Sequence, residues 1–87
     1  SDKTNKSKSL RGIGKSYTYN SKPDSGLIYL SQALLLSKSI NDKEEVVRIH
    51  NNISNAYFEL KQFKKALEHN SRALNITMDS TSKYINS

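Results

Sequence analysis

Hydrophobic residues recur at helical spacing along most of the chain. In the second half they fall at i, i+3, i+4 and i+7 from about Lys43 to Leu60, the pattern of one buried helix face. Asp42, followed three residues later by Glu45, forms a capping-box pattern that places the start of this helix. A second apolar run predicts another helix from about 63 to 77. The two segments together predict an antiparallel helix pair.

The first half of the chain shows the same pattern in a weaker form. Leu10, Ile13 and Tyr17 share one helix face, and residues 20–22 read as a turn. Pro23 suits the first position of a following helix, and Asn41 is expected to end that helix in the left-handed conformation. The polar, Lys-rich residues 1–9 are expected to fray.

The two halves correspond residue by residue when the sequence is shifted by 40 positions. The matches fall on apolar or small positions: Ile13 on Ile53, Tyr17 on Tyr57, Leu27 on Leu67, Gly26 on Ala66, Ala33 on Ala73 and Leu34 on Leu74. The chain is therefore interpreted as a single domain of two repeats, about 8–41 and 42–78, with a tail at 79–87. The tail, with Tyr84 and Ile85, is expected to form a short capping helix begun at Ser80 or Thr81.

The run Asn52 to Phe58, followed by Phe63 to Glu68 and Ser71 to Leu74, resembles the tetratricopeptide repeat. The residues at four key slots of the repeat agree with the family: Ile53, Tyr57, Ala66 and Ala73. Four positions depart from its usual pattern: His50, Ser54, Lys61 and Met78. The spacing exceeds the usual 34 residues and is similar to that of repeat regions in bacterial signalling regulators and scaffold proteins. The resemblance implies an all-α fold of stacked antiparallel helix pairs, a short solenoid, and we expect a fragment of a larger protein.

The resemblance also implies a binding module without chemistry of its own. In this family the first helices of the repeats line a groove that holds a peptide or a partner helix. Mapping the repeat slots onto this sequence assigns a basic, Asn-containing groove made of Lys8, Arg11, Lys15, Arg48, Asn51, Asn52, Asn55 and Phe58. Cationic and amide groups suit an acidic peptide, since they can bond its carboxylates and its backbone.

Composition narrows the range of partners. The chain has 87 residues and a net charge of +6, from 14 Lys and Arg against 8 Asp and Glu, which favours acidic partners in general. It has no cysteine, hence no disulfide and no thiolate metal site, and no apolar run long enough for membrane insertion. We expect no cofactor, no metal and no enzymatic activity. Localisation is not fixed by the sequence, although the cytoplasm is slightly favoured.

Two alternatives to peptide binding stay open at this point. The basic face, with Tyr19 and Tyr29, could instead bind nucleic acid. The chain could also act as a spacer or form a homodimer through an open apolar edge near Ala73, Ile76, Tyr84 and Ile85, because two repeats leave one face of the stack uncovered. The two histidines are 19 residues apart and give no support for a metal site; His50 is expected inside and His69 on the outer surface.

Overall fold

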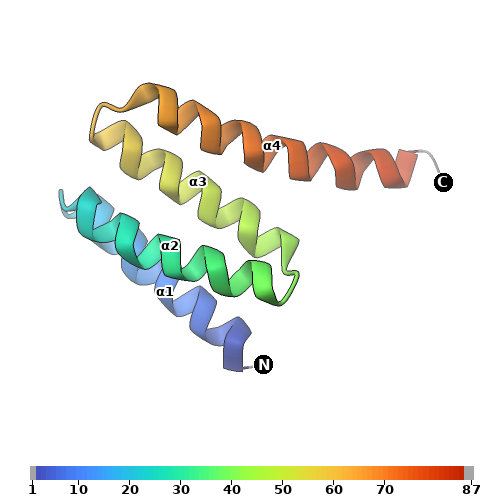
Figure 1. Ribbon diagram of the computed structural model, residues 1–87, viewed down its shortest axis with the longest axis horizontal. Helices are drawn as coiled ribbons and strands as arrows, with labels where there is room; N and C mark the ends of the chain where they lie inside the picture. Colours follow the sequence, from blue (N-terminus) through green and yellow to red (C-terminus); the bar gives the residue numbers. More distant parts are fainter. Residues whose placement is uncertain (1, 86–87) are drawn as a thin grey trace.

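Four helices follow one another in the computed structural model, which describes the backbone of residues 2–85 and the side chains of residues 2–79. They are α1 (Asp2–Tyr19), α2 (Pro23–Ser39), α3 (Lys43–Glu59) and α4 (Phe63–Ile85). Figure 1 shows them stacked in chain order, with α1 and α4 at opposite ends of the molecule. We call α1 with α2 the first helix pair and α3 with α4 the second. The predicted all-α solenoid is confirmed.

Each of the three turns between the helices contains one residue with a positive φ angle. Ser21, Asn41 and Lys61 each adopt a left-handed conformation, with φ of 64°, 54° and 61°. Asn tolerates this conformation better than Ser or Lys, and its place at residue 41 confirms the predicted end of α2. These turn residues stand at intervals of 20, so each helix together with its turn occupies half of the 40-residue period.

The core lies where the two helix pairs meet. Leu30 and Ala33 of α2 are buried against Ile49, Ile53 and Ala56 of α3. Half-buried apolar residues surround this cluster: Leu10, Leu27, Leu34 and Tyr57. The repeated apolar positions of the sequence therefore serve the contact between pairs as well as the contact within each pair.

The helices of the first pair cross closely because glycines face each other. A Cβ on Gly14 would lie 2.6 Å from Cγ of Leu30 and 2.9 Å from the carbonyl oxygen of Gly26. A Cβ on Gly26 would lie 2.7 Å from the carbonyl oxygen of Gly14 and 2.5 Å from Oγ1 of Thr18. These distances are shorter than van der Waals contact, so the crossing depends on the absence of both side chains.

Both ends of the chain differ from the sequence prediction. Helix α1 begins at Asp2 and not near residue 8, and the hydroxyl of its buried Ser7 donates a hydrogen bond of 3.2 Å to the carbonyl oxygen of Ala33 in α2. This bond secures the segment that was expected to fray. At the other end, α4 continues without a break to Ile85, so the expected separate capping helix is part of α4. The side chains of Tyr84 and Ile85 lie outside the described residues.

Two predictions about apolar faces also need correction. Ile13 stands at the position of Ile53, yet it is 42% exposed whereas Ile53 is 3% exposed, because Ile53 packs in the core between α2 and α3 and Ile13 lines an open hollow among the described residues. Of the residues predicted at the open edge, Ala73 is only 4% exposed and Ile76 is half-buried, whereas Tyr84 and Ile85 lie outside the described side chains. Within residues 63–79 of α4, the large apolar residues that are exposed are Phe63, Leu67, Leu74 and Met78.

Candidate protein-binding face

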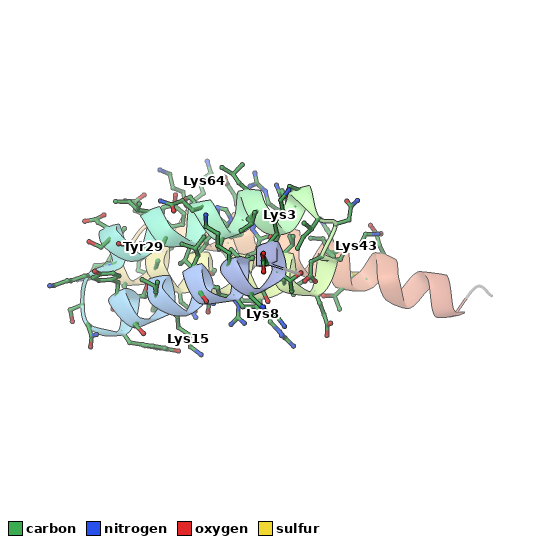
Figure 2. All side chains as sticks on the ribbon, turned by 90° about the horizontal axis from the view of Figure 1, so that it is seen from below. Lys3, Lys8, Lys15, Tyr29, Lys43 and Lys64 are labelled. Carbon is green, nitrogen blue, oxygen red and sulfur yellow. The ribbon has the colours of Figure 1, made fainter. Side chains whose placement is uncertain are left out.

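The first candidate groove residues lie on one face of α1. Lys8 and Lys15 are exposed and seven residues apart, and Figure 2 shows both on one side of the helix, away from Lys64 of α4. The Nζ of Lys15 lies 5.8 Å from the centre of the exposed Tyr19 ring. Within the described part of the chain, neither lysine forms an ion pair with an acidic side chain. Their charges are therefore available to a ligand.

Helix α3 offers the matching positions of the second pair. Arg48 stands at the position of Lys8, and Asn55 at that of Lys15, when the 40-residue shift is applied. Both side chains are exposed, and Asn52 between them is half-buried. Arg48 makes one loose ion pair, 3.8 Å from Glu44 on its own helix. A pair this exposed contributes little to stability and leaves the guanidinium free to exchange partners.

Arg11 has a structural partner. Its Nε donates to Oε2 of Glu45 at 2.5 Å, which joins α1 to the first turn of α3. The Glu45 side chain is 1% exposed, and its other oxygen, Oε1, is buried without a hydrogen-bond partner among the described residues. The backbone N–H of Glu45 also donates to Asp42 at 3.1 Å, so that half of the predicted capping box is present. Its side chain, however, pairs with Arg11 across the two helix pairs.

The two remaining candidates, Asn51 and Phe58, both lie on α3. Asn51 is exposed at the position that Arg11 holds in the first pair. Phe58 packs edge-on against Phe63 at the start of α4, with ring centres 5.2 Å apart, and stays 60% exposed. In the first pair the position of Phe58 is held by Thr18, which is buried. Phe58 thus belongs to the turn between α3 and α4.

The structure brings together a group of rings that the sequence analysis did not anticipate. Tyr17 stacks on Tyr29 in the first pair, with ring centres 5.4 Å apart and planes inclined by 7°. In the second pair Tyr57 stacks in the same way on His69, at 5.6 Å and 24°. The expectation that His69 lies on the outer surface is wrong, since it is half-buried and stacked. The 40-residue shift from Tyr29 to His69 was the signal that could have revealed it.

The two histidines bond directly. Nδ1 of His50 lies 2.9 Å from Nδ1 of His69, so one nitrogen donates and the other accepts, which requires at least one neutral ring. Burial, followed by the charges of His69, Lys38 and Arg72, lowers the pKa of His50 to about 4. Burial, followed by Arg72, also lowers the pKa of His69, while Glu68 acts in the opposite direction. Both imidazoles are therefore neutral at pH 7.

The two histidines have no further metal-ligating side chain beside them among the described residues. Across residues 2–79, no group of three or more His, Asp or Glu side chains is arranged to hold a metal ion. The cations Lys38 and Arg72 near the pair would also repel a metal. In the same part of the chain, no helix combines the length and hydropathy of a membrane span.

The fold and the exposed faces define a helical-repeat module in which stacked helix pairs present a surface. A sequence model of the tetratricopeptide repeat matches residues 6–79, and the chain belongs to the tetratricopeptide repeat family. No curated protein and no solved structure gives a significant match. Repeats of this family generally mediate contacts between proteins and generally lack catalytic activity.

Proposed function

We propose that this chain is a non-enzymatic module that binds an acidic, extended peptide on the face formed by α1 and α3. The observation that supports this most is the free positive charge of Lys8 and Lys15 on one side of α1. Arg48, Asn52 and Asn55 continue the same face on α3, which contacts α1 directly. The lysines and the arginine would bond the carboxylates of the peptide, and the amides would bond its backbone.

The remaining candidates take secondary roles in this proposal. Arg11 holds α1 against α3 through Glu45 and can offer only its outer N–H groups to a ligand. Asn51 and Phe58 would extend the contact toward α4 for a longer partner. A regulatory or scaffold protein, of bacterial origin as the repeat spacing suggests, would use such a module to recruit a partner.

Nucleic acid is the weaker alternative for the same face. Bases bind single-strand sites by stacking on open aromatic rings. Tyr17 and Tyr29 stack on each other, so neither offers two free faces, and Tyr19 is already near Lys15. This favours a peptide over a nucleic acid.

The test is a binding titration with a short, fluorescent, Glu-rich peptide that ends in a free carboxylate. Lys8→Ala combined with Lys15→Ala should weaken binding about tenfold, as expected when two charge-assisted bonds are lost. The matched control is Lys3→Ala with Lys64→Ala, which removes the same charge from outside the proposed face. An equal loss of affinity in both variants would mean that the peptide responds only to the net charge of the chain. No loss in either would remove this face from consideration, and tighter binding of single-stranded DNA would favour the alternative.

A further inference from the structure

Among the described residues, α4 and α1 expose faces that complement each other. Leu27 and Leu34 of α2 are half-buried against the core cluster that α2 forms with α3. Their equivalents on α4, Leu67 and Leu74, are 65% and 58% exposed. The greater exposure of Leu67 and Leu74 identifies the part of α4 that a further packed helix would cover.

Helix α1, at the opposite end of the molecule, has a hollow on its outer side. Residues on the outer side of α1 line a shallow hollow of about 640 Å³: Ser9, Gly12, Ile13, Ser16, Tyr17 and Asn20. None of them is charged, and a Cβ placed on Gly12 would meet nothing within 4 Å. Ile13 is exposed there, whereas Ile53 at the same position of α3 is buried by α2. A helix could therefore approach α1 closely, as α2 approaches α3.

We infer that the α4 face of one copy packs into the α1 hollow of a second copy, so that copies stack head to tail. The interface between α2 and α3 within the chain indicates that a second copy fills the hollow. At a shift of 40 residues, α4 corresponds to α2 and α1 corresponds to α3, so α4 of one copy can pack on α1 of the next as α2 packs on α3. The contact would bury Leu67, Leu74 and Met78 of one copy against Ile13 and the small residues of the next. This surface is distinct from the Lys8 and Lys15 face.

The geometry determines how the assembly grows. Helices α1 and α4, which carry the two faces, lie at opposite ends of the molecule (Figure 1), so each added copy leaves one α1 face and one α4 face open. Such a heterologous contact does not close at two copies. Each copy carries a net charge of +6, so added salt should strengthen stacking by screening repulsion. Salt should weaken the binding of an acidic peptide, which separates this proposal from the previous one.

The experiment measures the mass of the full chain by light scattering from about 10 μM to about 1 mM, where weak contacts become populated. We expect an average mass that rises past that of a dimer. Leu74→Glu and Ile13→Glu should each weaken association at least about 30-fold, or about 2 kcal/mol, since each places a charge in an apolar contact. Leu35→Glu is the matched control, because Leu35 is 73% exposed on α2 and lies outside both faces.

Mixing the two variants gives the sharpest test. Leu74→Glu retains an intact α1 face and Ile13→Glu an intact α4 face, so their mixture should form a complex of one copy each and stop there. Helical content of each variant is followed by circular dichroism, and both substituted residues are already exposed, so the variants should stay folded. A wild-type monomer at every concentration would overturn the proposal. A loss of association in Leu35→Glu would also overturn it. So would a dimer that Leu74→Glu abolishes and that does not form again when the Ile13→Glu variant is added.

Discussion

The two helix pairs build the same stack of rings from different side chains. Tyr17 on Tyr29 in the first pair corresponds to Tyr57 on His69 in the second, and Leu10 corresponds to His50. In the second pair, the hydrogen bond between the two histidines is added to the stack. Equivalent geometry thus comes with different chemistry, and the second pair alone carries imidazoles, which bind a proton near pH 6.5 in the unfolded chain.

The pairs also differ in the residues at the point where their helices cross. Gly14 and Gly26 face each other in the first pair, while Ser54 and Ala66 hold these positions in the second and are both buried. The second crossing accommodates side chains that the first cannot. The two pairs therefore keep the same repeat length with side chains of different size at the crossing.

The largest predicted effect concerns Arg11, which bonds across the two pairs, and Asn51, its equivalent in the second. Arg11→Ala leaves the buried carboxylate of Glu45 unpaired and should lower the free energy of unfolding by about 3–5 kcal/mol. Asn51→Ala, at an exposed site, should change it by less than about 0.5 kcal/mol. Urea denaturation measures both. The double variant Arg11→Met with Glu45→Gln should recover most of the loss; equal effects of the two single variants would contradict this account.

The next effect depends on pH and should arise in the second pair alone. An unfolded histidine binds a proton near pH 6.5, whereas the pKa of His50 in the folded chain is about 4. Its contribution to stability is complete above pH 6.5 and is lost as the pH falls toward 4. From His50 the loss should reach about 2 kcal/mol at pH 5, which thermal melting would detect.

Converting the second pair into a copy of the first provides the control. The double variant His50→Leu with His69→Tyr installs the residues of Leu10 and Tyr29 at their equivalent positions. Its melting temperature should change less than that of the wild type between pH 6.5 and 5, where the carboxylates of both proteins titrate alike. Identical pH profiles would show that the histidine pair does not govern acid stability.

The smallest effect tests the helix crossing. Gly26→Ala gives the first pair the residue that Ala66 supplies in the second, and its Cβ would meet the carbonyl oxygen of Gly14 at 2.7 Å. We expect a net loss of about 1 kcal/mol, since crowding outweighs the gain in helix propensity. Gly12→Ala has no such contact and should stabilise the chain by up to about 1 kcal/mol. Stabilisation by both substitutions in urea denaturation would mean that the crossing can widen.

The sequence predicted the helix pairs well because their signals are local. Spacing of apolar residues, Pro23 at a helix start and Asn41 at a helix end depend on a few neighbouring residues, and the structure has all of them. Relations between pairs were harder to predict. Nothing in the spacing of Glu45 indicates that its side chain bonds Arg11 rather than its own helix end, and the exposure of Ile13 depends on which helix is adjacent.

The candidate face was predicted in part for the same reason. Exposed positions such as Lys8 and Lys15 follow from helical periodicity, which also separated them from the core. The position of His69 did not follow, because the sequence analysis treated a polar ring as a surface residue. A neutral imidazole can stack as a tyrosine does, and its place in the repeat indicated its environment better than its polarity.

The order of the helices has a consequence for how fast the chain folds. Contacts join α1 to α2, α2 to α3, α3 to α4 and α1 to α3, so the described helices touch others close to them in sequence. Chains with short sequence separations between contacts close small loops and fold in microseconds to milliseconds. Either helix pair could form first and serve as a template for the other. We therefore expect the main refolding phase to be rapid.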